Sequence, residues 1–208
     1  MIAVIDYGLG NLRSICAALD RLGVPYEQTS DKNRISQAQG LILPGVGAFP
    51  DGMRNLQKLD LVDFLDDIVL KNKRPILGVC LGFQLMASEG QEFSRVTGLG
   101  WFNARVVRMD QNTSSIRIPH VGWNDCLRLI DSPIFSDIPK EALFYFTHSY
   151  HMECLEKEDV LAVSEHGKQF VAAAQKGKIY GTQFHPEKSQ LHGLSLIKNF
   201  VDKVVSEC

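Results

Sequence analysis

Short apolar runs that end in glycine-bearing turns constrain this fold more than any other feature of the sequence. Ile2–Ile5, Gly40–Leu43 and Pro75–Val79 are each followed by such a turn, and amphipathic stretches separate them. This alternation is typical of βα units that feed a parallel sheet buried on both faces. We therefore expect an α/β fold with a central, mostly parallel sheet flanked by helices.

The amphipathic stretches predict the helices. Apolar residues recur at helical spacing from Leu12 to Leu22, and Gly23 then ends the pattern. Residues 53–72 hold enough apolar positions for one or two more helices. Residues 191–204 predict a final amphipathic helix that packs back on the sheet.

After about Gly98 the sequence becomes rich in predicted strands. Lys176-Gly177, between the last two strands, is a hairpin signal. No internal repeat or linker divides the chain, so we predict one domain over residues 1–208 with an antiparallel, β-rich second half. The expected strands of this half are residues 104–108, 115–118, 143–146, 160–163, 170–174 and 178–184.

Composition narrows the function classes. The formal net charge is −2 and no Lys/Arg-rich run occurs, so we expect no nucleic-acid partner. No apolar stretch is long enough to cross a membrane, and the N-terminus lacks signal-peptide features. The five cysteines are scattered without a Cys-x-x-Cys pair, which argues against a disulfide framework and against zinc. We expect a cytoplasmic protein with reduced thiols, no metal and no cofactor.

Gly78-Val-Cys-Leu-Gly82 places one thiol between two glycines where an apolar run ends. A strained strand-to-helix turn that presents a nucleophile needs small neighbours, and this pentapeptide has them. The N–H of Leu81 would then face an oxyanion, and the start of the next helix would favour a thiolate. Free cysteine is also common in cores, so the pentapeptide alone fits both a nucleophile and a buried structural thiol.

His185-Pro-Glu187 offers a base and a group to orient it, at the end of a predicted strand. Residues two apart in a strand face the same way, so Glu187 would lie beside His185 and hold its ring. Pro44-Gly-Val-Gly47 follows another strand, and its glycines let a backbone N–H turn toward a ligand. His185–Glu187 is equally compatible with a strand end whose polar side chains face solvent. Pro44–Gly47 is equally compatible with a tight turn that binds no ligand.

Six motifs carry a resemblance to a known family. Three of them resemble the class I (triad) glutamine amidotransferases: Gly78–Gln84, Pro44–Gly47 and His185–Ser189. Three more are similar to the glutaminase subunits of imidazole glycerol phosphate synthases within that family: Asp6–Asn11, Pro119–Asn124 and Phe146–Tyr150. The motifs are spread in order over nearly the whole chain. The resemblance implies a flavodoxin-like class I glutamine amidotransferase fold and a single glutamine amidotransferase type-1 domain over residues 1–208.

The resemblance implies that the chain hydrolyses the side-chain amide of free L-glutamine to L-glutamate and ammonia. Cys80 would be the nucleophile, His185 would move the proton, and Glu187 would orient the imidazole. The residues expected to supply oxyanion donors are Val46, Gly47 and Leu81. The residues expected to contact glutamine are Gly45, Gln84, Ser149 and Tyr150.

The resemblance also implies a partner, because ammonia released into water would be lost as ammonium. The expected partner is a (βα)₈-barrel cyclase subunit, bound as a heterodimer, that makes imidazole glycerol phosphate and aminoimidazole carboxamide ribotide in histidine biosynthesis. The residues that match its interface and channel are Asn11, Pro119, Trp123, Tyr145 and Lys188. Lys188 also fits a solvated charge, and Trp123 also fits simple packing. A further implication is that Pro44–Gly47 stays inactive until the partner binds its own ligand.

Three alternatives compete with this interpretation. A paralogous amidotransferase that feeds ammonia to another synthase, for instance in surface aminosugar amidation, would carry the same glutamine motifs. A cysteine hydrolase of the same fold is disfavoured, because His185–Glu187 and Pro44–Gly47 serve glutamine in the family. A non-enzymatic interaction subunit would keep its function without Cys80.

Overall fold

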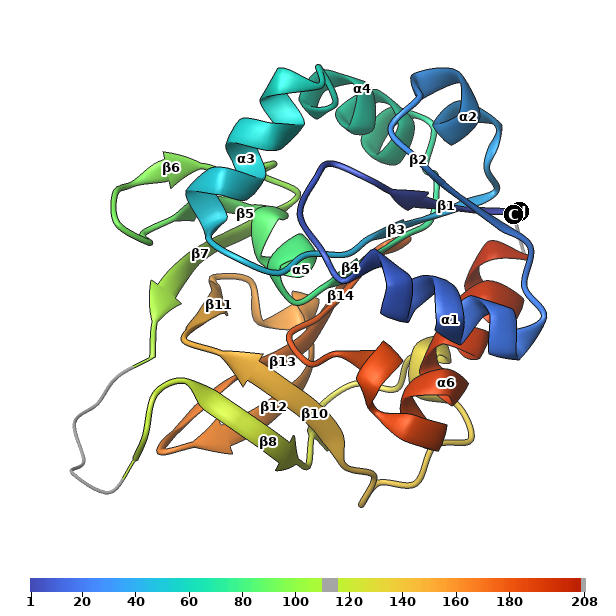
Figure 1. The fold of residues 1–208 in the computed structure, drawn as a ribbon. Coiled ribbons are helices and arrows are strands. Elements are labelled where there is room, and N and C mark those ends of the chain that lie inside the picture. The colour runs from blue at the N-terminus through green and yellow to red at the C-terminus, as the bar shows by residue number, and fades with distance from the viewer. Residues whose placement is uncertain (110–115, 207–208) are drawn as a thin grey trace.

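The structure is a computed structural model that describes residues 1–109 and 116–206 (Figure 1). Its α-helices are α1 (Leu12–Leu22), α2 (Lys32–Gln37), α3 (Phe49–Lys58), α4 (Val62–Asp66), α5 (Leu81–Leu85) and α6 (Gln190–Asn199). Its strands are β1 (Ile2–Ile5), β2 (Tyr26–Thr29), β3 (Gly40–Leu43), β4 (Ile76–Val79), β5 (Ala87–Gly90), β6 (Val96–Thr97), β7 (Phe102–Arg108), β8 (His120–Asn124), β9 (Leu127–Arg128), β10 (Phe144–His148), β11 (Tyr150–Cys154), β12 (Val160–His166), β13 (Lys168–Lys176) and β14 (Ile179–Thr182). Its other helical segments, which are 3₁₀ or π helices, are Asp67–Lys71, Pro133–Phe135, Lys157–Asp159, Pro186–Lys188 and Phe200–Val205.

The largest sheet of the described residues has the strand order β2-β1-β3-β4-β14-β13-β12-β9. Neighbouring strands are parallel from β2 to β14 and antiparallel from β14 to β9. A second sheet, β11-β7-β5-β6, and the pair β10-β8 complete the β-rich half. The expected α/β fold, parallel first and antiparallel later, is confirmed.

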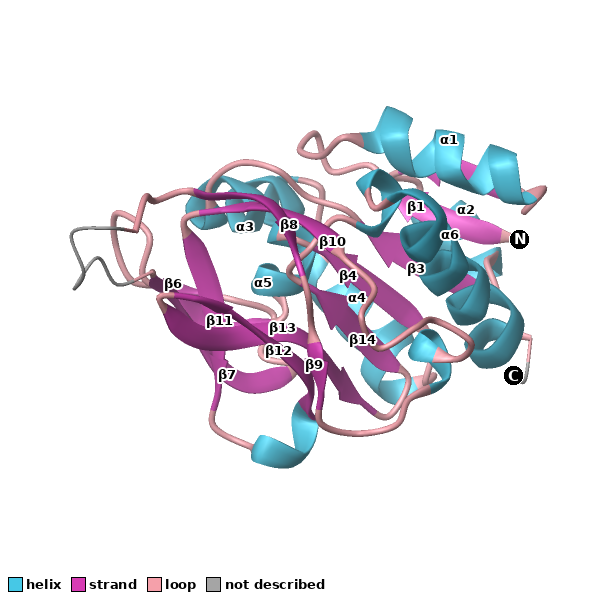
Figure 2. Cartoon of the chain, turned by 90° about the horizontal axis from the view of Figure 1, so that it is seen from below, coloured by secondary structure: helices cyan, strands magenta, loops and turns pink. Residues whose placement is uncertain are grey.

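Helices cover both faces of the parallel part. Helices α2, α3 and α4 lie on one face, and α1 and α6 lie on the other (Figures 1 and 2). Strand β1 supplies both cores, because Ala3 and Ile5 pack with the first group of helices while Ile2 and Val4 pack with the second. Burying one such aliphatic side chain is worth about 1.5–3 kcal/mol, so the two cores fix the sheet between its helix layers.

Two of the expected elements differ in the structure. Residue 115 lies outside the described residues, and Ile116–Ile118 do not form the expected strand; β8 begins only at His120. Pro119 explains that start, since proline has no N–H to donate to a ladder. The helix expected after Cys80 is short, because α5 ends at Leu85 and the chain passes directly into β5.

The carboxyl ends of β1, β3, β4 and β14, which are neighbours in the sheet, lie at one edge of its parallel part. In open α/β sheets, ligands bind beyond the carboxyl ends of the strands. The expected functional loops therefore emerge side by side. Within the described residues, no helix has both the length and the apolar character needed to span a bilayer.

Candidate active site

Cys80 occupies a strained turn between β4 and α5. Its φ of +52° and ψ of −108° lie outside the regions that most non-glycine residues adopt. Its backbone N–H donates to the Thr182 carbonyl at 2.8 Å, which ties the turn to β14. A Cβ on Gly82 would lie 1.8 Å from the Leu43 carbonyl oxygen, so only glycine lets this turn approach β3. Backbone strain of this kind gathers at functional sites.

His185 and Glu187 form a buried pair just beyond β14. His185 Nδ1 and Glu187 Oε1 are 2.8 Å apart, and both side chains are 1% exposed. We expected the two side chains to meet because residues two apart in a strand face the same way. They meet instead through the tight turn Pro186–Lys188, whose first residue is a proline. Because Nδ1 bonds to Glu187, the reactive nitrogen is Nε2, which is buried and bonds to no oxygen or nitrogen of the described residues.

The charge state of His185 depends on its neighbours. Burial lowers the pKa of His185, but the negative charge of the nearby Cys80 sulfur and the bond to Glu187 outweigh burial and raise the pKa to about 10. His185 therefore holds its proton when the Cys80 sulfur is negatively charged, so the two opposite charges stabilise each other. An imidazolium beside a cysteine favours the thiolate, which is the nucleophilic form.

A cavity of about 420 Å³ opens above Cys80. Gly45 and Glu187 do not line it: Gly45 packs beneath Leu81, and Glu187 stands behind His185. The structure thus brings together most of the residues that sequence reasoning assigned to catalysis and glutamine binding. Those that line the cavity are Val46, Gly47, Cys80, Leu81, Gln84, Ser149, Tyr150 and His185.

One of the expected oxyanion donors, the N–H of Leu81, is not free in this conformation. The N–H of Leu81 donates to the Gly45 carbonyl at 3.4 Å. Gly47 has a φ of +112°, which glycine adopts without strain. The Gly45 carbonyl therefore stands where an oxyanion would accept, and the Gly45–Gly47 loop must turn before Leu81 can donate to a ligand.

Gln84 is committed to a polar network inside the cavity wall. Its Nε2 donates to the Tyr150 carbonyl at 2.8 Å and to Gln183 Oε1 at 3.0 Å. Gln183 in turn donates from Nε2 to Cys80 Sγ at 3.7 Å. Sequence reasoning missed Gln183, although its place two residues before His185, on the same side of an extended chain, is a usable signal.

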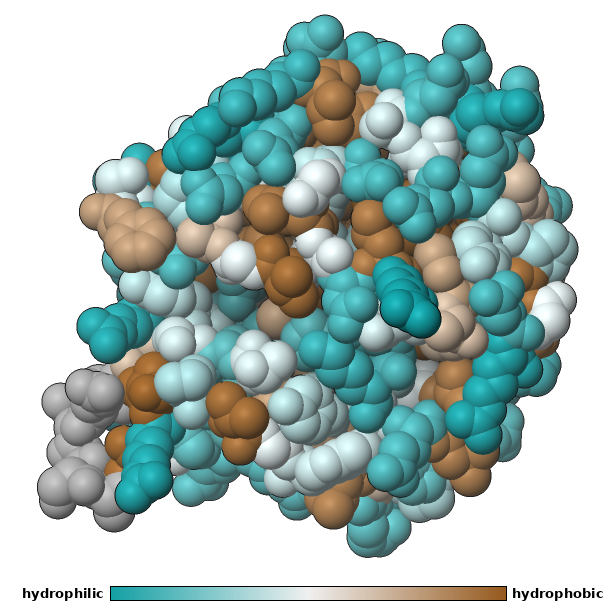
Figure 3. All heavy atoms as spheres, in the orientation of Figure 1, coloured by the Kyte–Doolittle hydropathy of each residue, from teal (hydrophilic) through white to brown (hydrophobic). Residues whose placement is uncertain are grey.

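Three of the five expected partner residues cluster beside the cavity. Trp123 and Tyr145 face each other across β8 and β10 with ring centroids 5.9 Å apart, and Lys188 Nζ lies 5.9 Å from the Tyr145 ring. Trp123 is 44% exposed although it is large and apolar. Apolar groups are exposed in separate clusters among hydrophilic ones on the face of Figure 3.

The other two expected partner residues have different surroundings. Pro119 lines the cavity itself. The side chain of Asn11 accepts from the Ser14 N–H at 3.3 Å and so caps α1. Helix α1 packs against the Pro186–Lys188 turn, which keeps Asn11 on the same side of the molecule as His185.

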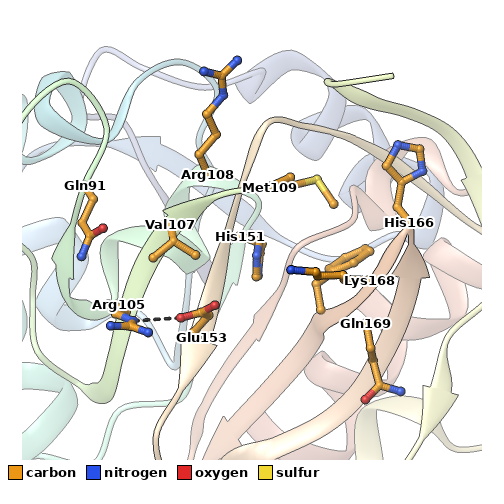
Figure 4. Close-up of a pocket in the computed structure, with 11 residues that line it drawn as sticks. Gln91, Arg105, Val107, Arg108, Met109, His151, Glu153, His166, Lys168 and Gln169 are labelled. Carbon is orange, nitrogen blue, oxygen red and sulfur yellow. Dashed lines mark hydrogen bonds and ion pairs between the residues drawn. The ribbon is translucent and has the colours of Figure 1, made fainter. Parts of the chain in front are cut away.

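A larger cavity of about 560 Å³ lies over β7, β11 and β13 (Figure 4). Arg105 Nε bonds to Glu153 there at 2.8 Å, and Arg108 points away from this pair. None of the described residues that line it is a cysteine, serine or threonine. The described lining of this cavity therefore offers charged side chains but no hydroxyl or thiol nucleophile. Within residues 1–109 and 116–206, no three His, Cys, Asp or Glu side chains are grouped so that they could hold a metal ion.

Comparison with known sequences gives matches over nearly the whole chain. The sequence model of the family described as glutamine amidotransferase class-I matches residues 3–204. The imidazole glycerol phosphate synthase subunit HisH 2 of Pseudomonas aeruginosa is 42% identical over 98% of this chain and 100% of its own length. The imidazole glycerol phosphate synthase subunit HisH of Moorella thermoacetica is 44% identical over 98% of this chain and 95% of its own.

Solved structures give the same fold. A structure described as a glutamine amidotransferase superposes with a TM-score of 0.74 at 21% identity, over 99% of this chain and 98% of that one. The glutaminase domain of CTPS from Trypanosoma brucei has a TM-score of 0.63 at 18% identity, over 96% of this chain and 93% of that one. At these identities the likeness speaks for the fold, and it confirms the amidotransferase fold expected from the sequence.

Proposed function

The chain belongs to the class I glutamine amidotransferase family, and we infer that it is the glutaminase subunit of an imidazole glycerol phosphate synthase. Identities of 42% and 44% over nearly the full length to two such subunits support this function. The enzyme hydrolyses L-glutamine to L-glutamate and ammonia for histidine biosynthesis. We propose that residues 1–208 form one amidotransferase type-1 domain, in line with a family match over residues 3–204.

In the proposed reaction the Cys80 thiolate attacks the side-chain amide carbon of glutamine. The C–N bond breaks as His185 gives its Nε2 proton to the departing ammonia, and a thioester to Cys80 remains. Water then attacks the thioester, His185 takes up a proton from it, and glutamate leaves. Glu187 holds the ring through Nδ1 and supports its positive charge. The observation that carries this proposal is the buried His185–Glu187 pair, with a bond of 2.8 Å, beside the strained Cys80.

The proposal includes a rearrangement of the Gly45–Gly47 loop. The tetrahedral intermediate needs backbone donors, and the 3.4 Å bond from the Leu81 N–H to the Gly45 carbonyl occupies one of them. Turning that carbonyl away frees Leu81 and lets an N–H of Val46 or Gly47 face the oxyanion. One missing donor costs roughly 100- to 1000-fold in rate, so the resting enzyme is a poor glutaminase until the loop turns.

We further propose that a (βα)₈-barrel cyclase docks over the mouth of the small cavity and receives the ammonia. The exposed Trp123, its contact with Tyr145, and Lys188 beside them form an aromatic and charged surface next to His185. Aromatic anchors with a charged rim are common at protein interfaces. The described cysteines, Cys16, Cys80, Cys126 and Cys154, are free thiols, which supports a reducing, cytoplasmic setting.

Reconstitution tests the proposal. The purified chain is mixed with a cyclase subunit of an imidazole glycerol phosphate synthase, and glutamate formation is measured with and without the cyclase substrate. We expect little turnover alone and a rise of roughly 100-fold or more with the liganded partner, because the oxyanion donors then become available. Equal turnover in both conditions would contradict the proposed loop rearrangement.

Cys80→Ala separates glutamine hydrolysis from the partner's synthesis. Glutamine-dependent product formation should disappear, while synthesis from added ammonium salt should persist, since the partner is intact. The matched control is Cys126→Ala, another buried thiol, which should keep glutamine-dependent synthesis. Glutamine-dependent synthesis by Cys80→Ala would instead favour a non-enzymatic interaction subunit.

A further inference from the structure

Gln183 is a fully buried polar side chain in direct contact with the nucleophile. It follows the last residue of β14, is 0% exposed, and its backbone N–H donates to the Ala172 carbonyl at 2.8 Å. Its Nε2 lies 3.7 Å from Cys80 Sγ, within the range of an N–H···S hydrogen bond. A buried amide held against a sulfur needs an explanation, because most buried polar groups find oxygen or nitrogen partners.

The network around Gln183 fixes which end of its amide faces the sulfur. The Tyr150 carbonyl can only accept, so the atom of Gln84 that bonds to it at 2.8 Å must be the donor Nε2. The same Nε2 gives its second hydrogen to Gln183 at 3.0 Å, so that contact must be the acceptor Oε1. The NH₂ end of Gln183 is therefore left for Cys80, and a flipped amide would lose the bond to Gln84.

We propose that Gln183 stabilises the Cys80 thiolate by donating a hydrogen bond to its sulfur, and that Gln84 holds Gln183 in the donating orientation. The proposal rests on the function proposed for this site. An N–H donor favours a negatively charged acceptor over a neutral one, so the bond stabilises thiolate more than thiol. Gln183 is thus a second donor near the sulfur besides His185, but it is neutral and transfers no proton.

The position of Gln183 predicts which kinetic constant it controls. Gln84 lines the cavity where glutamine would bind, whereas Gln183 stands behind Cys80 and does not line that cavity. Loss of the Gln183 donor should therefore lower kcat, by about tenfold for one hydrogen bond to a charged group, and change KM little. Loss of Gln84 should change both constants.

The test is the pH dependence of Cys80 alkylation by iodoacetamide, because only the thiolate reacts. The rate is followed on the peptide that contains Cys80 by mass spectrometry. Gln183→Met keeps the length of the side chain and removes the hydrogen-bond donor. We expect the midpoint of the curve of alkylation rate against pH to rise by about one pH unit. Gln183→Glu, which sets a carboxylate oxygen against the sulfur, should raise it further.

Apart from the carboxyl group that Gln183→Glu adds, the titratable groups around Cys80 are the same in every variant. His185 and Tyr7 act directly on Cys80, and Glu92 and His148 line the same cavity. The matched control is Gln175→Met, since Gln175 lies on β13 and bonds to Ser132 and Gly177 rather than to the site. Its alkylation midpoint should equal that of the wild type.

An unchanged midpoint in Gln183→Met, with a folded protein, would overturn the proposal. If that variant does not fold, Gln84→Met tests whether Gln84 holds the Gln183 amide in place. Without its bond to Gln84 the Gln183 amide can flip, and the alkylation midpoint should then rise by a smaller amount. An unchanged midpoint there would also contradict it. The alkylation assay needs neither glutamine nor a partner. If the chain had no glutaminase activity, the proposed function would be contradicted, but the assay would still measure the effect of Gln183 on Cys80.

Discussion

The two cavities of this molecule differ in how their walls are built. The smaller one, about 420 Å³, lies beyond the ends of β3, β4 and β14, and two of its lining residues, Cys80 and His185, are bonded to the buried side chains of Gln183 and Glu187 behind them. The larger one, about 560 Å³, lies over strands of the antiparallel half and is lined by charged side chains, among them the paired Arg105 and Glu153. Volume alone therefore points to the wrong cavity for the chemistry.

The difference shows what a reactive site requires. In the smaller cavity a strained backbone holds Cys80, and burial makes each neighbouring charge act strongly on it. In the larger cavity, side chains that are 54% and 41% exposed make the Arg105–Glu153 bond, and water screens their charges. Changes to the smaller cavity should accordingly have large effects, and changes to the larger one small effects.

The largest expected effect is on the charge of His185 in Cys80→Ala. Without the sulfur, burial acts against Glu187 alone, and we expect the pKa of His185 to fall from about 10 to near or below its ordinary value of 6.5. At pH 8 the imidazole should thus be protonated in the wild type and neutral in the variant, and the wild type should lose the proton only as pH rises through about 10. NMR of the imidazole measures both. If His185 titrated equally in the wild type and in Cys80→Ala, charges in the smaller cavity would not interact as strongly as we expect.

The next effect concerns the backbone of the smaller cavity. In Gly82→Ala the new Cβ would lie 1.8 Å from the Leu43 carbonyl oxygen, so the turn must move. We expect the free energy of unfolding to fall by about 3 kcal/mol or more. Gly23→Ala is the control: Gly23 has a φ of +66° but nothing within 4 Å of its Cβ position, and this variant should lose only about 1 kcal/mol. Urea unfolding measures both, and equal losses would mean that the turn relaxes freely.

The smallest effect is expected in the larger cavity. Arg105→Met breaks the exposed pair with Glu153, and the free energy of unfolding should change by less than about 1 kcal/mol. Glutaminase activity with the partner should stay the same, because the pair lies outside the smaller cavity. A large loss of activity in this variant would show that the two cavities are coupled.

Sequence patterns predicted the parts of the fold where one period dominates. Ile2–Ile5, Gly40–Leu43 and most of Pro75–Val79 are fully apolar and became β1, β3 and β4. Strand β2, Tyr26–Thr29, went unpredicted because it is a partly exposed edge strand with polar residues, held by its parallel pairing with β1. Such a strand is specified by its neighbour more than by its own residues.

The candidate site was predictable to the extent that its residues stand in short motifs. Cys80 and the pair His185–Glu187 have glycine or proline beside them, which marks tight turns. Gln183 has no glycine or proline beside it; its spacing from His185 indicates only its side of the chain, and its contacts with Cys80 and Gln84, far away in the sequence, appear only in the structure. The bond from Leu81 to the Gly45 carbonyl was equally out of reach, since the same glycine loop permits both orientations of the peptide.

The parallel pairing of β4 with β14 determines where this protein can tolerate insertions and deletions. Gly181 pairs with Gly78 and Thr182 with Val79, so Cys80 and His185 leave the sheet at nearly the same level. All of β5 to β13 lies between them in the sequence, and of these strands β13 pairs with β14 while β10 accepts from the His185 N–H through the Tyr145 carbonyl at 2.9 Å. Loops in that segment can lengthen or shorten while the nucleophile and its base keep their spacing. A single residue inserted between Thr182 and His185 would instead separate them, so evolution and engineering have room in the middle of the chain and almost none at this junction.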